Sequence, residues 1–83
     1  MEEQVARRVE EIVLAIHRRN GGTLEQLPWD APLLARELRL DSLDLAEVMA
    51  AVEKEFGVSP FDQERPPRTW RELVTCILQA RKE

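Results

Sequence analysis

The chain has 83 residues, enough for one small hydrophobic core and too few for a core plus a separately folded catalytic domain, so we expect a single domain over residues 1–83. Its hydrophobic share of 43% and charged share of 34% favour a soluble globular protein over a disordered chain. The only cysteine, Cys76, and the only histidine, His17, exclude an internal disulfide and a metal centre built from Cys and His. We expect Cys76 to be a small residue at the edge of the core.

Charge is distributed unevenly along the chain. The net charge is −4, but residues 41–64 hold seven acids and one base, for a net charge of −6, whereas residues 65–83 have a net charge of +3. A nucleic-acid-binding helix needs an excess of Lys and Arg to neutralise phosphates, so the acidic middle excludes that class of function. The chain has no apolar run of membrane-spanning length and begins with acids in place of a basic leader, which predicts no membrane span and a cytoplasmic location.

Residues 1–19 are predicted to form the first helix, because their apolar residues recur at helical spacing: Val5, Val9, Ile12, Val13 and Ile16. Acids at the start and Arg18 and Arg19 at the end complement the helix dipole, and Asn20, Gly21 and Gly22 then stop the helix. His17 lies beside the apolar stripe near the basic end. We expect it to be solvated or to pair with the helix dipole, and we assign it no function.

Residues 23–41 are predicted to form a long connection, because Pro28 and Pro32 interrupt regular structure. A loop of this length in a compact domain is usually functional or contains a short turn, and residues 33–38 are the best candidates for that turn. The loop also supplies apolar anchors that we expect to pack across the bundle: Leu24, Leu27, Trp29, Leu33, Leu34, Leu38 and Leu40.

A second helix is predicted to begin at Asp41 or Ser42 and to run to about Phe56, where Gly57 ends it. Its apolar residues again follow helical spacing, and Val48 and Val52 are expected in the core. After it, Ser59 and Pro60 are typical of the start of a short helical turn, which we expect to extend to Glu64.

The last helix is predicted to start at Thr69, because Thr69 and Glu72 have the spacing of a capping box. Trp70 and Ile77 lie on its apolar stripe and are expected in the core. No segment alternates apolar and polar residues as a strand does. The sequence therefore predicts an all-α fold, a small four-helix bundle of three main helices and one short one, with a long first loop.

The most informative stretch is Asp41-Ser42-Leu43-Asp44, at the junction of the long loop and the second helix. Taken alone it is typical of a helix cap. Its context is more specific: residues 38–44, together with residues 53–58 (Glu-Lys-Glu-Phe-Gly-Val), resemble the acyl and peptidyl carrier proteins, in which an Asp-Ser-Leu sequence begins the second helix and a similar run ends it. This resemblance covers almost the whole chain.

The resemblance implies that Ser42 receives 4′-phosphopantetheine from coenzyme A as a phosphodiester, in a reaction catalysed by a separate phosphopantetheinyl transferase. The thiol of the arm would then hold cargo as a thioester and present it to successive enzymes. The chain itself is expected not to be an enzyme, because it offers no pair of nucleophile and base, no metal cluster and no phosphate-binding glycine loop.

Partners implied by the resemblance are the transferase and acyl-synthase, ketosynthase-type or adenylating enzymes that carry basic docking patches. The second helix would be the docking surface, through its acids and through small or apolar side chains, and we expect the carrier to be a monomer. The same residues could instead form a solvated face or ordinary packing. The predicted docking residues are Asp41, Leu43, Asp44, Ala46, Glu47 and Glu53.

Three departures from the family pattern favour a specialised carrier over a generic fatty-acid carrier. Arg39 stands where a glycine is common, Lys54 interrupts the acidic run, and Pro60 followed by Phe61 replaces an aliphatic residue followed by proline. Two other hypotheses remain beside an acyl or ketide carrier of fatty acid or polyketide synthesis. One is a peptidyl or aminoacyl carrier of a nonribosomal-type system, and the other is an unmodified helical interaction module. A carrier of either kind could be free-standing or excised from a multidomain synthase.

Overall fold

The computed structural model describes residues 3–62 and 64–81, with the side chain of residue 81 left out. Three α-helices follow one another along the chain: α1 (Glu3–Arg19), α2 (Ser42–Phe56) and α3 (Trp70–Arg81). Two short 3-10 turns, η1 (Arg36–Leu38) and η2 (Pro60–Asp62), lie before and after α2. The described residues contain no strand, only an isolated bridge between Pro32 and Thr69. The predicted all-α fold is confirmed.

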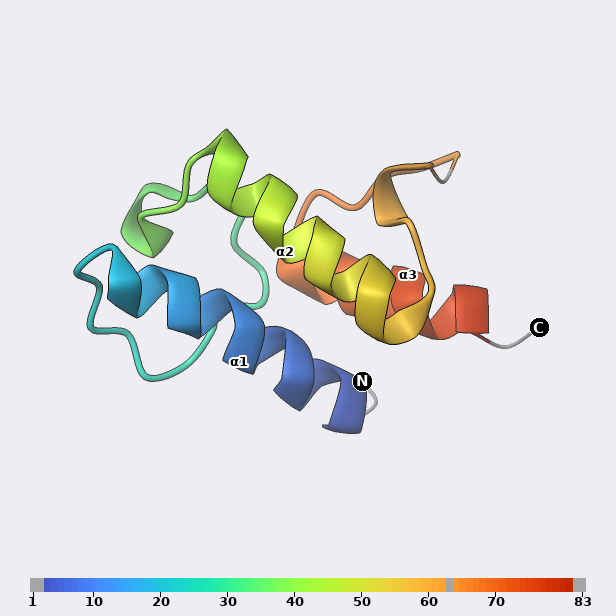
Figure 1. Ribbon diagram of the computed structural model, residues 1–83, viewed down its shortest axis with the longest axis horizontal. Helices are drawn as coiled ribbons and strands as arrows, with labels where there is room; N and C mark the ends of the chain where they lie inside the picture. Colours follow the sequence, from blue (N-terminus) through green and yellow to red (C-terminus); the bar gives the residue numbers. More distant parts are fainter. Residues whose placement is uncertain (1–2, 63, 82–83) are drawn as a thin grey trace.

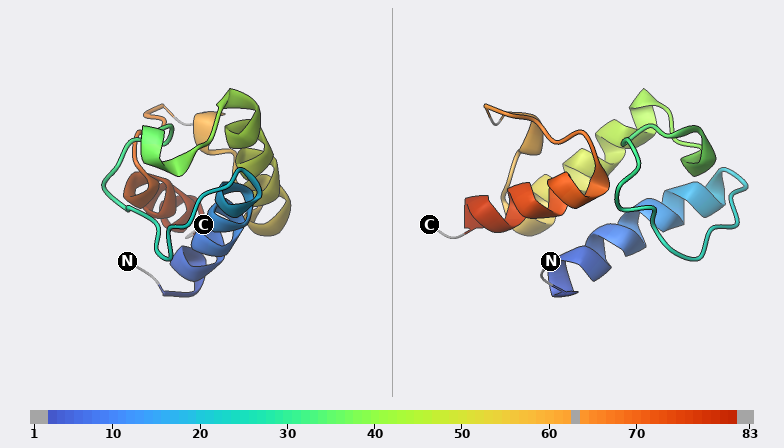
Figure 2. Two further views of the ribbon diagram at one scale, coloured as in Figure 1. Left: turned by 90° about the vertical axis from the view of Figure 1, so that its left-hand side faces the viewer. Right: turned by 180° about the vertical axis from the view of Figure 1, so that it is seen from behind.

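The three helices gather around one core (Figure 1, Figure 2), and α1 contacts both α2 and α3. Each helix packs its predicted apolar stripe against the core, although Leu45, Met49, Phe56 and Leu78 are only partly buried. Val48, Val52, Trp70 and Ile77 are all fully buried, which confirms the predicted core. No described helix is long and apolar enough to cross a membrane.

The long loop is fastened to the bundle at several points. Its apolar anchors Leu27, Leu33, Leu38 and Leu40 are buried, whereas Leu34 is 46% exposed. Backbone hydrogen bonds join it to the start of α3: the Leu33 amide donates to the Arg68 carbonyl at 3.1 Å, and the Arg71 amide donates to the Trp29 carbonyl at 2.9 Å. The turn η1 forms inside the expected range of residues 33–38. The loop is therefore an ordered layer of the fold and fixes where α2 begins.

His17 corrects the expectation of a solvated side chain, because it is only 1% exposed. Its Nδ1 lies 2.8 Å from the Leu38 carbonyl oxygen, and its Nε2 accepts from the Leu24 amide at 3.0 Å. This pattern fits the tautomer that is protonated at Nδ1. A Cβ atom at Gly22 would collide with the imidazole, so the ring occupies the space that a glycine leaves. His17 thus binds α1 to the loop at two places, Leu24 near the start of the loop and Leu38 near its end.

The predicted ends of α3 and of the short helix need small corrections. Helix α3 begins at Trp70, with Thr69 just before it: the Thr69 hydroxyl accepts from the Glu72 amide at 3.1 Å. The Glu72 carboxylate accepts from the Arg68 amide at 3.0 Å, one residue earlier than a capping box on Thr69 requires.

The short helix expected up to Glu64 is a single 3-10 turn, η2, and no fourth helix is established within the described residues; residue 63 of this prediction lies outside them. The reversed order of proline and apolar residue has a clear structural result. Pro60, the first residue of η2, is buried, whereas Phe61, which follows it, is 45% exposed beside α2.

Candidate functional site

Ser42 is the first residue of α2, and the backbone before it explains its position. After η1, Arg39 adopts the left-handed conformation, with φ of 59° and ψ of 30°, and Asp41 is extended. A side chain in the left-handed region costs about 1 to 2 kcal/mol. Arg39 thus adopts a conformation that a glycine favours, at the position where the family commonly has a glycine. The buried side chain of Leu40 anchors this turn to the core.

A complete capping box fixes the start of α2. The Asp41 carboxylate accepts from the Asp44 amide at 2.8 Å, and the Asp44 carboxylate accepts from the Asp41 amide at 3.2 Å. Between these two acids, Ser42 is exposed and Leu43 is 78% exposed. The helix start thus holds the serine hydroxyl in solvent at the positive end of the helix dipole.

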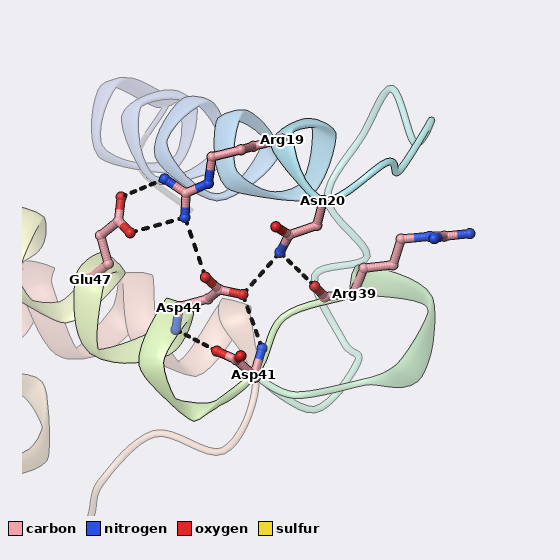
Figure 3. A network of polar contacts seen from close by, with 6 residues as sticks. All are labelled: Arg19, Asn20, Arg39, Asp41, Asp44 and Glu47. Carbon is pink, nitrogen blue, oxygen red and sulfur yellow. Dashed lines mark hydrogen bonds and ion pairs between the residues drawn. The ribbon is translucent and has the colours of Figure 1, made fainter.

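A polar network joins this helix start to the end of α1 (Figure 3). The Asn20 amide nitrogen donates to the Asp44 carboxylate at 2.9 Å and to the Arg39 carbonyl at 2.8 Å. The Arg19 guanidinium donates to the Asp44 carboxylate at 3.3 Å. The side chain of Arg39 itself points away from the network (Figure 3). The turn before Ser42 is therefore tied to α1 through both a carbonyl and a carboxylate.

Hydrogen bonds hold the pKa of Asp44 below its usual value. The largest cause is the bond from the Asp41 backbone amide, followed by the bond from Asn20, and the Arg19 cation adds to both. These donors all favour the ionised carboxylate. Asp44 is thus an anion with its oxygen atoms already occupied, and its side chain is only 17% exposed.

The other predicted docking residues face solvent. Glu47 pairs with Arg19, whose guanidinium donates to its two carboxylate oxygens at 3.0 and 3.3 Å, while the Glu47 side chain stays 53% exposed. The structure thus brings the predicted docking residues onto one helix but divides them into a half-buried residue, Asp44, and an exposed set: Asp41, Leu43, Ala46, Glu47 and Glu53.

An open groove of about 380 Å³ begins at Ser42 and runs along α2 to Phe61. Its floor is apolar or small, formed by Leu45, Ala46, Met49 and Ala50. The apolar side stripe of the helix is visible in the sequence. The part played by Phe61 is not, because it depends on the fold of η2, which brings Phe61 to the groove lined by α2.

Sequence reasoning missed Arg19, Asn20 and His17 as parts of this region. The first two carry local signals of a helix end, and their contacts to Asp44 span 25 and 24 residues. No periodic pattern encodes contacts of that separation. The opposite charges of Arg19 and of the acids of α2 are the one signal in the sequence that could have indicated the pairing.

The site presents Ser42 in solvent at the first position of α2. Both ring nitrogens of His17 are engaged by backbone groups, so the only histidine is unavailable as a base for Ser42. Among the residues that the structure describes, no group of His, Cys, Asp or Glu could hold a metal ion. An exposed serine hydroxyl at a helix start, beside an open groove, fits a residue that another enzyme modifies, and it leaves room for a covalently attached phosphopantetheine.

The family model described as a phosphopantetheine attachment site matches residues 7–64. The match extends from α1 through the long loop and α2 to the turn that follows, and so includes Ser42 and both capping acids. Comparison with curated proteins and with solved structures gave no match. Because the match covers more than half of the chain, the chain belongs to the phosphopantetheine-binding carrier proteins, the acyl carrier family, whose cofactor is covalently attached 4′-phosphopantetheine.

Proposed function

We propose that Ser42 is the attachment residue, modified from coenzyme A by a separate phosphopantetheinyl transferase. The observation that carries this proposal is the exposed Ser42 hydroxyl at the first position of α2, inside the Asp-Ser-Leu sequence and inside the family match. When bound, the group supplies a flexible arm that ends in a thiol. The residues of the chain contribute an accessible hydroxyl, a fixed helix start and an open surface beside them.

The modified carrier holds an acyl, ketide or aminoacyl group as a thioester for fatty acid, polyketide or related biosynthesis, with a peptidyl carrier role as the second candidate. Carrying is a matter of effective concentration: a cargo tethered near a docked enzyme reacts as if it were concentrated there. The apolar groove beside Ser42 and the exposed Phe61 support a carrier of apolar cargo. We further propose that the carrier is a cytoplasmic monomer.

Docking of partner enzymes is proposed for the exposed face of α2 around Ser42. Residues 41–64 have a net charge of −6, and five of the six predicted docking residues face solvent. Long-range attraction between this face and a basic patch speeds encounter and weakens as salt shortens the Debye length to roughly 8 Å at physiological strength. Leu43 supplies an apolar contact at the centre of the face.

The attachment residue is tested by intact mass before and after incubation with coenzyme A and a broad-specificity transferase. The wild type should gain one phosphopantetheine, Ser42→Ala should gain none, and Ser59→Ala, which removes the other serine of the chain, should still gain one. An unchanged wild-type mass beside a modified control carrier would support the unmodified interaction module and overturn the carrier function.

Docking is tested by the rate of the same reaction. Glu47→Lys should slow modification of Ser42 at low salt, with helical content retained, because it reverses a charge five residues from the serine. Glu55→Lys makes the same charge change at the other end of α2 and should slow it less. Equal rates for the two variants would show that the acids near Ser42 are only a solvated face.

A further inference from the structure

Arg19 lies at the end of α1 and forms an ion pair with Glu47 on the proposed docking face of α2. Its guanidinium extends across to α2, where it forms two roughly parallel hydrogen bonds with the Glu47 carboxylate, at 3.0 and 3.3 Å (Figure 3). Such fork-shaped pairing is the geometry that arginine prefers with a carboxylate. Glu47, an exposed acid of the docking face, therefore already has a cationic partner inside the molecule.

The two acids that Arg19 contacts differ in how easily a partner could reach them. Asp44 also accepts hydrogen bonds from Asn20 and from the Asp41 amide, and its side chain is only 17% exposed. Glu47 has a 53% exposed side chain, and Arg19 is 54% exposed. An exposed pair of this kind is weak and exchanges readily. Glu47 can therefore exchange Arg19 for a cation on a partner protein, whereas the Asp44 carboxylate remains bound at the helix start.

We propose that Arg19 is a specificity-determining residue that competes with basic partners for Glu47, so that a partner engages Glu47 only by displacing the Arg19 side chain. This inference rests on the proposed docking function of α2. It predicts that Arg19 lowers the association rate with any partner whose docking patch is simply basic. It also predicts that a partner with an acid placed to receive the displaced guanidinium is favoured over one without it, because the released cation would otherwise face a basic surface.

The chain contains a matched control for this idea. Arg18 and Arg19 are neighbours at the end of α1, and both are exposed. Among the described residues, Arg19 pairs with Asp44 and Glu47, whereas Arg18 takes part in no ion pair. Arg19→Gln and Arg18→Gln thus remove the same charge from almost the same place, and only the first removes the competitor.

The experiment measures kcat/KM for modification of Ser42 by a phosphopantetheinyl transferase with a basic docking patch, at low salt and with saturating coenzyme A. Arg19→Gln should raise kcat/KM by about two- to fivefold over Arg18→Gln, as expected for release of one exposed ion pair. The gap should close as salt is added. Arg19→Lys keeps the charge but loses the fork, so it should give a smaller gain.

A double-mutant cycle assigns the effect to Glu47. In a Glu47→Gln background, Arg19→Gln should no longer raise kcat/KM above Arg18→Gln, because residue 47 no longer has a charge that Arg19 could withhold from a partner and Asp44 stays bound at the helix start. A gain of the same size in that background would overturn the inference. With Glu47 intact, equal rates for Arg19→Gln and Arg18→Gln would also overturn it, and so would the absence of any gain for Arg19→Lys. Failure of the proposed function is distinct from these results: the wild type and every variant would then remain unmodified.

Discussion

The two ends of α2 are held against the rest of the molecule by different means. At the start, polar side chains carry the contact: Asp44 binds Arg19, the last residue of α1, and Asn20, which follows it. Further along, the buried valines Val48 and Val52 carry it, and in the last turn Phe56 packs against the core beside an exposed ion pair. Apolar burial thus holds the helix in the fold, whereas polar contacts hold its first turn, and with it Ser42, beside the end of α1.

The exposed pair at the far end is Arg8 with Glu55, whose carboxylate oxygens lie 2.6 and 2.8 Å from Arg8 Nε. The arginine holds the pKa of Glu55 below its usual value through that hydrogen bond. Even so, both groups remain in contact with solvent, so the pair adds little to what the core already provides. Charged side chains therefore hold the first turn of α2 in place but add little stability at its last turn.

The largest expected effect comes from the apolar part of α2. Val52→Asp should unfold the domain, because an unpaired buried charge costs about 3 to 5 kcal/mol, comparable to the whole stability of a domain of this size, about 4 to 12 kcal/mol. Thermal unfolding followed by circular dichroism measures the loss. Ala50→Asp adds the same residue at an exposed position of the same helix and should remain folded. Equal melting temperatures for Val52→Asp and wild type would show that Val52 does not face the core.

A smaller effect is expected at the polar end. Asn20→Ala removes two hydrogen bonds, to the Arg39 carbonyl and to the Asp44 carboxylate, and should lower the free energy of unfolding by about 1 to 2 kcal/mol. Urea unfolding measures it. Glu55→Gln, at the other end of α2, breaks only an exposed pair and should change stability less. If the two variants were equally stable, the polar network would not hold the helix start.

The smallest effect depends on pH. The folded pKa of Asp44 is depressed, so its contribution to stability is present above the unfolded value of about 3.9 and is lost as the pH falls through the folded value. The difference in melting temperature between wild type and Asp44→Asn should therefore be greatest above about pH 5 and should shrink towards pH 3. The depressed pKa values of Asp30 and Glu55 are common to both proteins and cancel in this difference. A difference that does not change with pH would show that the charge of Asp44 plays no part.

Much of the fold could be predicted because its signals are local. Periodic apolar residues fix the three helices and the buried faces that contain Val48, Val52, Trp70 and Ile77. The start of α2 was also predictable, since Asp41 and Asp44 have the spacing of a capping box. The short helix was harder, because a single turn has too few residues to show a period, and it proved to be the 3-10 turn η2.

The sequence by itself determined the helices, their caps and the exposed place of Ser42 at the start of α2, because each depends on residues within one or two turns of one another. Only the tertiary structure decided that His17 is buried against the Leu38 carbonyl and that Arg19 lies against Glu47. Those contacts join residues 21 and 28 positions apart. Hydrogen bonds and ion pairs are directional and short, so they form only after burial of the apolar stripes has brought α1, the loop and α2 together.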